Sequence, residues 1–101
     1  MIGRLWRGWT EPADADAYER FLRDDLFPQM ESIRGFRGGY VMRRPEGDEV
    51  AFVTLTLFDS LDDVKRFAGD GYETPVIEPE AARLLKRYEP RAEHYDAPVT
   101  P

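Results

Sequence analysis

The stretch VAFVTLTLF, residues 50–58, limits the possible folds more than any other part of the sequence, because every position in it is apolar or threonine. Successive side chains of a strand point to opposite faces of a sheet. The two sets are Val50, Phe52 and Phe58 on one face, and Val53, Leu55 and Leu57 on the other. A sheet with one face in water alternates apolar and polar residues instead. The pattern therefore predicts a strand that is buried on both faces.

Three further strands are predicted from aromatic and β-branched content and from the turn residues that separate them. The segment IGRLWRGW contains two tryptophans and no acid, FRGGYVMRR follows turn glycines, and PEGDE between the second and third strands suits a hairpin loop. The glycines of FRGG indicate a bulge or a close approach by another group. The predicted strands are residues 2–9, 36–44, 50–58 and 89–95.

Three helices are predicted between these strands. The first starts at Asp14 or Asp16, has apolar residues at helical spacing, and should end or kink at Phe27 because Pro28 follows. The second, SLDDVKRFAG, begins at Ser60 with cap-like spacing to Asp63, and its final glycine suits the left-handed position after a helix. A short third helix is predicted at residues 80–88.

This order, βαββαβ with one extra short helix, predicts a ferredoxin-like α+β fold: a four-stranded antiparallel sheet with the helices on one face. The other face would be apolar and uncovered. The cover that we expect is a second copy, sheet against sheet, which makes a homodimer; the alternative is a monomer whose loops fold over that face. One domain is expected over residues 1–96, followed by a loose tail at 97–101.

Composition excludes several classes of partner and location. The net charge of −6 disfavours binding to nucleic acid or to an anionic membrane surface. The chain has no cysteine, so a disulfide framework and a thiolate nucleophile are impossible. No segment resembles a signal peptide or a membrane span. We therefore expect a cytoplasmic protein with no nucleic-acid or membrane partner.

Several kinds of chemistry are also excluded. One histidine without any cysteine provides no strong set of metal ligands, so no metal site and no cofactor are expected. The segment GFRGG matches neither glycine-rich phosphate-binding motif, and neither Ser32 nor Ser60 lies in a nucleophile elbow. Hydrolase and kinase activities are therefore set aside.

The stretch FVTLTLFDSLDDVKRFAGDGYE, with the opening IGRLWRGWT, the hairpin at GDEV and the closing EHY, resembles the antibiotic biosynthesis monooxygenase-like domain family of the dimeric α+β barrel superfamily. The resemblance covers nearly the whole chain. It implies a homodimer with a pocket in each subunit between sheet and helices. Some members of this family oxidise polycyclic phenols with molecular oxygen and no cofactor, whereas others bind and degrade haem.

The sequence also departs from that family. Many members have a tryptophan at the end of the third strand and a histidine further along the following helix, where this chain has Phe58 and Phe67. The haem-degrading members resemble one another in an Asn, Trp and His set, and this chain has no asparagine. Haem degradation of that type is not expected.

The single histidine, His94, is the first catalytic candidate, because its ordinary pKa lies near neutrality and suits a base that removes a phenolic or an activated carbon proton. Two alternatives stay open. A strand histidine that faces the pocket can act in this way, and one that faces the dimer interface can serve as a structural ring. Alternation along the strand places His94 opposite Glu93 and Tyr95.

Arg4 and Trp6 complete the catalytic candidates, since a guanidinium or an indole N–H can hold a developing anion. Trp6 and Trp9 fall on opposite faces of the first strand, and core packing is the alternative role for both. Arg4, Arg7, Arg37 and Arg43 can instead pair with surface acids. The residues expected to bind substrate are Tyr40, Phe52, Thr54, Phe58, Phe67 and Tyr95.

Two functions are compatible with these residues. The first is a cofactor-independent oxygenase, a monooxygenase acting on an aromatic or polyketide-like small molecule. The second is a ligand-binding or stress-associated module of the same fold without catalysis, because an apolar aromatic pocket serves either role.

Overall fold

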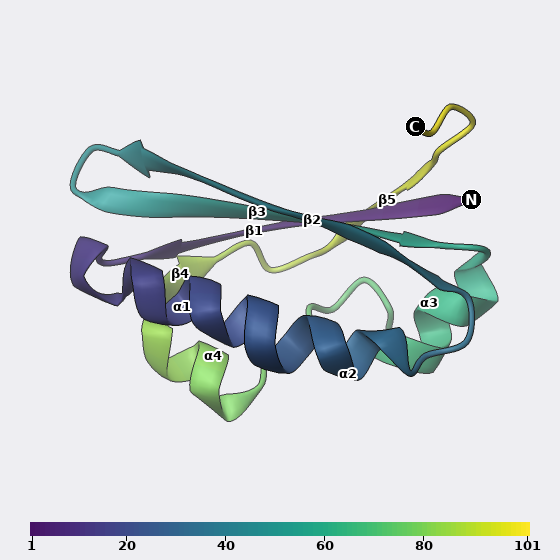
Figure 1. Ribbon diagram of the computed structural model, residues 1–101, viewed down its shortest axis with the longest axis horizontal. Coiled ribbons are helices and arrows are strands. Elements are labelled where there is room, and N and C mark those ends of the chain that lie inside the picture. The colour runs from purple at the N-terminus through teal and green to yellow at the C-terminus, as the bar shows by residue number, and fades with distance from the viewer.

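A computed structural model describes residues 1–101 as one antiparallel sheet with every helix on the same side (Figure 1). The strand order is β2-β3-β1-β4, and β5 also pairs with β1. The strands are β1 (Ile2–Thr10), β2 (Phe36–Glu46), β3 (Glu49–Phe58), β4 (Leu85–Tyr88) and β5 (Glu93–Asp96). The predicted ferredoxin-like α+β fold is thus confirmed. No helix has the length and apolar character that crossing a membrane requires.

Six helical segments form the layer under the sheet: η1 (Pro12–Asp14), α1 (Ala15–Phe21), η2 (Leu22–Leu26), α2 (Phe27–Glu31), α3 (Leu61–Ala68) and α4 (Pro79–Leu84). The first four follow one another without a break and form one continuous rod. Of the two outcomes predicted for Pro28, an end or a kink near Phe27, the helix does not end there; a π-helical turn, η2, lies directly before Pro28, which falls in the first turn of α2. A proline in a first turn removes no hydrogen bond that the helix needs.

The predicted helix at residues 80–88 was wrong in its second half. α4 ends at Leu84, and Leu85 has extended backbone angles that begin β4, which pairs with the end of β1. The last strand is also shorter than predicted, because residues 89–92 make no ladder and only β5 pairs with Ile2–Leu5 of β1. Pro90 lies in this gap and cannot donate to a ladder. The fourth strand is thus two short pieces along one edge of β1.

The glycines of β2 behave as the sequence predicts. The register against β3 shifts between Phe36 and Gly39, which marks a bulge, and Gly38 has a φ of 94°. A Cβ atom on Gly39 would collide with the backbone of Leu55. The end of α3 also matches its prediction, since Ser60 accepts a hydrogen bond from the Asp63 backbone and Gly69 has a φ of 81°.

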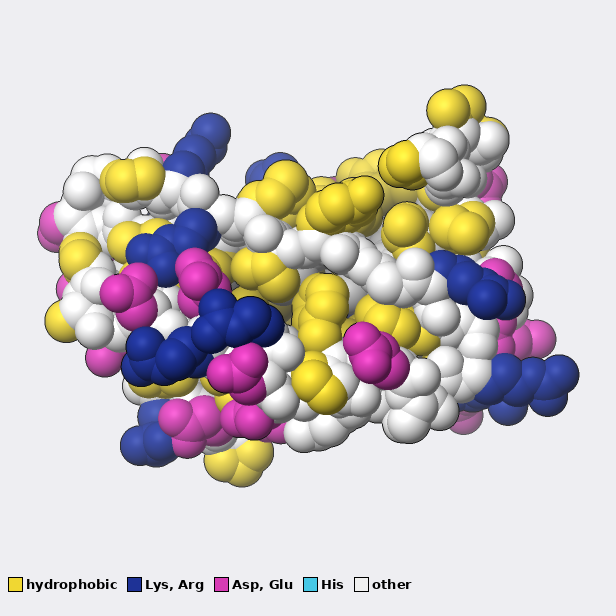
Figure 2. Space-filling model, in the orientation of Figure 1, with side chains coloured by type: hydrophobic (Ala, Val, Ile, Leu, Met, Phe, Trp, Pro, Cys, Tyr) yellow, Lys and Arg dark blue, Asp and Glu magenta, His cyan; other side chains and the backbone are white.

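Both faces of β3 are apolar, as predicted, but only one is covered within a single chain. Phe52 and Phe58 are fully buried under the helices, and the ring of Tyr18 from α1 meets Phe52 edge-on with 4.8 Å between centroids. On the other face, Tyr40 and Tyr95 remain about half exposed beside the half-buried aliphatic residues of β3. Figure 2 shows hydrophobic side chains along this side of the sheet. We call it the open face; no loop folds over it.

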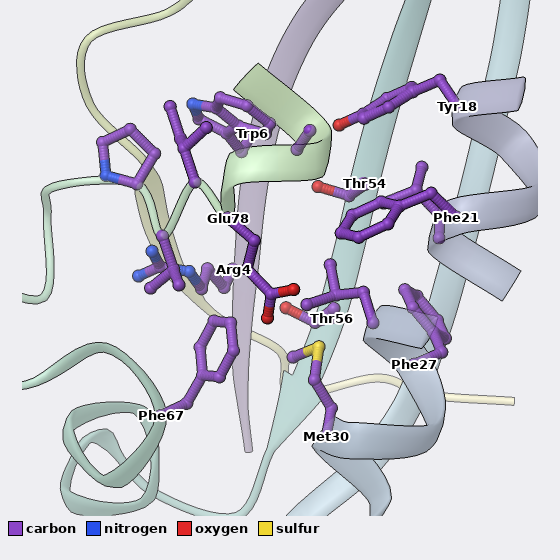
Figure 3. Close-up of a pocket in the computed structure, with 16 residues that line it drawn as sticks. Arg4, Trp6, Tyr18, Phe21, Phe27, Met30, Thr54, Thr56, Phe67 and Glu78 are labelled. Atoms are coloured by element: carbon purple, nitrogen blue, oxygen red, sulfur yellow. The ribbon is translucent and has the colours of Figure 1, made fainter. Parts of the chain in front are cut away.

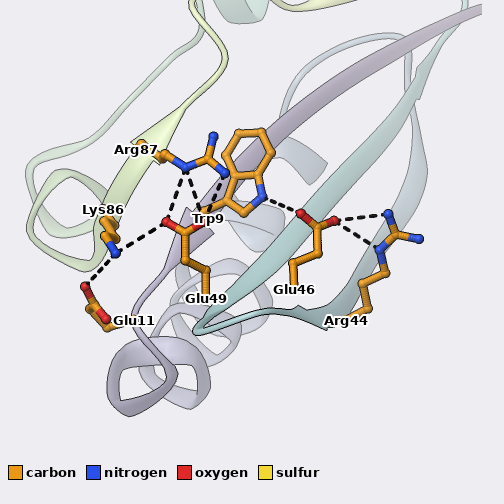
Figure 4. A network of polar contacts seen from close by, with 7 residues as sticks. All are labelled: Trp9, Glu11, Arg44, Glu46, Glu49, Lys86 and Arg87. Atoms are coloured by element: carbon orange, nitrogen blue, oxygen red, sulfur yellow. Dashed lines mark hydrogen bonds and ion pairs between the residues drawn. The ribbon is translucent and has the colours of Figure 1, made fainter.

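A polar network closes the hairpin end of the sheet (Figure 4). The guanidinium of Arg87 lies 3.8 Å from the ring centroid of Trp9, whose indole N–H donates to Glu46. Arg87 also pairs with Glu49, and that hydrogen bond holds the pKa of the Glu49 carboxyl below its usual value. Lys86 bridges Glu49 to Glu11. The short strand β4 is thereby fastened to β1 and β3 through side chains as well as through its backbone.

Candidate functional site

A pocket lies between the covered face of the sheet and the helices, with a cavity volume of about 50 Å³ (Figure 3). Its walls come from β1, β3, the rod α1–α2, α3, α4 and the irregular segment 69–78. Most of the lining is apolar. The lining residues with polar groups are Arg4, Trp6, Tyr18, Thr54, Thr56 and Glu78. A mainly apolar cavity with a few convergent polar groups is typical of small-molecule sites.

Arg4 is the cation of this pocket. It points from β1 to the covered face, opposite Thr56 of β3, and is only 6% exposed. Its guanidinium donates to the backbone carbonyls of Tyr72 and Thr74, and one Nη lies 2.9 Å from Nε2 of His94. No carboxylate lies within ion-pair distance. Burial lowers the pKa of Arg4 to about 10. Arg4 is therefore a buried cation without a counter-ion.

The other arginines considered as anion binders are placed differently. Arg37 forms a two-pronged ion pair with Asp59, and Arg43 pairs with Asp16 and Glu19. Arg7 is exposed and points to the open face. Of the four arginines, only Arg4 lines the pocket.

His94 stands behind Arg4 at the edge of the sheet. β5 places it opposite Arg4 in the register, on the covered side, with its ring edge-on to Tyr72 at 5.1 Å between centroids. Because a guanidinium can only donate, Nε2 of His94 acts as the acceptor, and the neutral ring then carries its proton on Nδ1. Burial, and then the charge of Arg4, lower the pKa of His94. The ring does not line the pocket and does not face the open face.

The lowered pKa of His94 predicts that this residue makes the free energy of unfolding depend on pH. Its folded-state pKa lies below the unfolded value, so the unfolded chain takes up a proton first as the pH falls below about 6.5. The free energy of unfolding should therefore decrease from pH 7 to pH 5, and decrease less in a His94→Gln variant. Urea unfolding at several pH values measures both slopes. Equal slopes in the two proteins would remove His94 from this titration, since the carboxylates contribute equally to both.

The remaining predicted site residues fall into three groups. Trp6, Thr54 and Phe67 line the pocket with Arg4. Phe52 and Phe58 belong to the adjacent core rather than to the lining. Tyr40 and Tyr95 lie on the open face, opposite the pocket. Trp6 offers its ring and not its indole N–H, because that group already donates to the Glu89 carbonyl at 2.8 Å.

Twelve of the sixteen lining residues were not singled out by the sequence as site residues, and Tyr18, Met30 and Glu78 are among them. Tyr18 and Met30 belong to the apolar stripe of the first helix. Residues that line a pocket and residues of the core have the same spacing along such a stripe, so the sequence does not distinguish them. Glu78 follows an irregular segment between two prolines, for which no period exists. Burial raises the pKa of Tyr18, so its phenol stays a hydrogen-bond donor rather than a base.

No group of three His, Cys, Asp or Glu side chains is arranged to hold a metal ion. The accepting nitrogen of His94 is already engaged by a cation, which would repel a metal ion at the same place. The residues present are therefore a poor set for ligating haem iron.

The sheet, the single helical layer and the pocket between them define an α+β protein with the fold of antibiotic biosynthesis monooxygenase-like proteins. A Caulobacter crescentus protein provisionally designated an antibiotic biosynthesis monooxygenase matches with a TM-score of 0.70 and 19% identity, over 95% of this chain and 88% of that one. SnoaB, a cofactor-independent oxygenase from Streptomyces nogalater, matches with a TM-score of 0.58 and 21% identity, over 98% and 95%.

The haem-degrading protein MhuD from Mycobacterium tuberculosis matches with a TM-score of 0.61 and 16% identity, over 99% of this chain and 98% of that one. No family model and no curated protein matches the sequence. At these identities the likeness establishes the fold. Function depends on the residues of the pocket.

Proposed function

We propose that this protein binds an aromatic or polyketide-like small molecule in the pocket and oxidises it with molecular oxygen, without a cofactor. The observation that carries the proposal is Arg4, a buried cation without a counter-ion at the wall of an aromatic pocket. A buried charge costs free energy unless it is paired. A ligand that becomes an anion would supply the missing partner.

The pocket has the donors that such a ligand needs. A guanidinium has five N–H donors, and three of those on Arg4 are directed at Tyr72, Thr74 and His94, which leaves two. The hydroxyl groups of Tyr18 and Thr54 point into the cavity (Figure 3). Aromatic walls from Trp6, Phe21, Phe27 and Phe67 suit a flat ring system.

The proposed reaction needs oxygen alone as co-reactant. A ring CH₂ that is conjugated through the aromatic rings with a carbonyl group loses a proton, and Arg4 stabilises the resulting anion through its charge and hydrogen bonds. The electron-rich anion transfers electrons to oxygen, forms a carbon–oxygen bond and then loses water. The balance is CH₂ + O₂ → C=O + H₂O, so the substrate itself provides both electrons that reduce the second oxygen atom.

Entry of such a substrate requires the pocket to widen, because a cavity of about 50 Å³ holds only a few water molecules. The segment 69–78 is the part of the wall with no regular structure. It is held by the two carbonyl contacts of Arg4 and by a hydrogen bond from the Ala92 backbone to Glu73. We propose that this segment moves outward when ligand enters.

The active unit that we propose is a homodimer formed through the open face. The face is apolar over β3 and its neighbours, and its tyrosines are half exposed in one chain. Exposed apolar patches of this kind mark sites of association. A second copy placed sheet against sheet would cover the face and leave the pocket, on the other side of each sheet, open to ligand.

The test is oxygen uptake by the purified protein with 1,8-dihydroxyanthrone, a tricyclic phenol with an acidic CH₂, in buffer that contains a metal chelator. Binding should raise the unfolding temperature; ligand at 100 times its dissociation constant stabilises by about 2.7 kcal/mol. An oxygen electrode should record consumption above the rate of buffer alone. Binding without consumption would reject the oxygenase in favour of the non-catalytic binding module, and an absence of binding would reject both.

A further inference from the structure

Glu78 is the only acidic residue that lines the pocket. It occupies the position just before α4, with extended backbone angles of φ −73° and ψ 156°. A side chain at this position often caps the helix, yet that of Glu78 makes no capping hydrogen bond. Figure 3 shows that its carboxylate turns into the cavity, toward Thr56. The backbone at the start of α4 thus aims a carboxylate at the ligand space.

The carboxylate of Glu78 has no partner in the protein, whereas its neighbour Glu80 pairs with Arg83. None of the twelve ion pairs of the chain includes Glu78, and Arg4 lies beyond ion-pair distance although both residues line the same pocket. A carboxylate among apolar side chains costs free energy unless something pairs with it. The pocket thus holds a cation and a carboxylate that do not pair with each other.

We propose that Glu78 is the catalytic base of this pocket. The inference rests on the proposed function and adds the group that removes the proton. The C–H bond of the activated CH₂ breaks, its proton goes to a carboxylate oxygen of Glu78, and the electron pair stays on the ligand as an enolate. The enolate oxygen faces Arg4. A flat aromatic ketone of the proposed class would place its acidic CH₂ at Glu78 and its carbonyl at Arg4.

The other candidate bases are less well placed. The accepting nitrogen of His94 is bound to Arg4, and the ring lies outside the lining. Tyr18 reaches the pocket, but burial raises its pKa and keeps it protonated. A base needs a free acceptor within reach of the proton. Glu78 is the pocket residue that has one.

The experiment is anaerobic exchange of the CH₂ protons of 1,8-dihydroxyanthrone with deuterated water, followed by mass spectrometry. Exchange requires proton removal and no oxygen, so it separates the base from the oxygenation. Wild-type protein should accelerate exchange, and Glu78→Gln should slow it by about 100-fold or more, as removal of a general base does. Glu78→Asp should recover part of the rate.

Glu80→Gln is the matched control, because it removes the same charge two residues away outside the pocket, and it should exchange at the wild-type rate. Ligand-induced thermal shifts verify that each variant is folded and binds. If Glu78→Gln exchanges at the wild-type rate and still consumes oxygen, Glu78 is not the base, although the oxygenase proposal stands. If exchange depends on Glu78 but the wild-type protein consumes no oxygen, Glu78 is the base and the oxygenase proposal fails. A wild-type protein that binds the anthrone without exchange would overturn Glu78 as base.

Discussion

Replacing Arg4 by methionine is expected to abolish oxygen uptake and to lower the free energy of unfolding by about 3 kcal/mol, because it removes two partly buried hydrogen bonds from a charged donor, each of which contributes about 1.5–3 kcal/mol. The carbonyls of Tyr72 and Thr74 would lose their donor, and the segment that covers the pocket would lose its attachment to β1. The methionine keeps the apolar stem but offers no cation to a ligand anion. Urea unfolding and an oxygen electrode measure the two effects.

Two variants separate charge from geometry in this test. Arg4→Lys retains the cation but not the planar fork that reaches both carbonyls, so it should restore part of the activity and little of the stability. Arg7→Met removes an arginine three residues along the same strand that points to the open face, and it should leave the pocket unaffected. An Arg4→Met protein that consumes oxygen as the wild type does would contradict the proposed function at its central residue.

Leu55→Asp is expected to prevent the proposed homodimer from forming. Leu55 lies in the middle of β3 on the open face, opposite Leu5 of β1 and Tyr40 of β2. A carboxylate there would be buried against the partner without a counter-ion, which costs about 3 kcal/mol or more and weakens association more than about 100-fold. Sedimentation velocity at micromolar concentration should give twice the 11.7 kDa chain mass for wild type and the single mass for the variant.

Gln29→Asp on α2 adds the same charge to an exposed position of the helical layer and should leave the proposed homodimer intact. A wild-type protein that sediments as a monomer would remove the homodimer from the proposal. The pocket would remain, because each pocket is built from one chain.

The sequence predicted the sheet and its two apolar faces well, because strand alternation depends on few residues and leaves little freedom in β3. It failed where tertiary contacts overrode local preference. Residues 85–88 have helix-compatible apolar spacing, yet the free edge of β1 pairs with them and draws them into β4. Pro28 is compatible with the rod only because η2 widens by one residue just before it.

Strand alternation also made part of the candidate site predictable. Arg4, Trp6 and Thr54 share one face through strand alternation, so their convergence follows from period and pairing. The partner of each side chain does not follow. That Trp6 uses its N–H on Glu89 and that Glu78 turns inward depend on irregular backbone with no repeating pattern, and that His94 accepts from Arg4 depends on the β1–β5 register, which the sequence does not specify.

The bulged strand β2 has a consequence for how copies can assemble. It forms one outer edge of the sheet, and there it carries a register shift, a run of arginines and Pro45. Such features prevent strand addition from a neighbouring molecule. The opposite edge is divided at Pro90 into two short pieces. Because neither edge of the sheet can accept a further strand, copies can associate only through the open face. A two-fold interface on that face is complete with two copies and does not extend into a fibre.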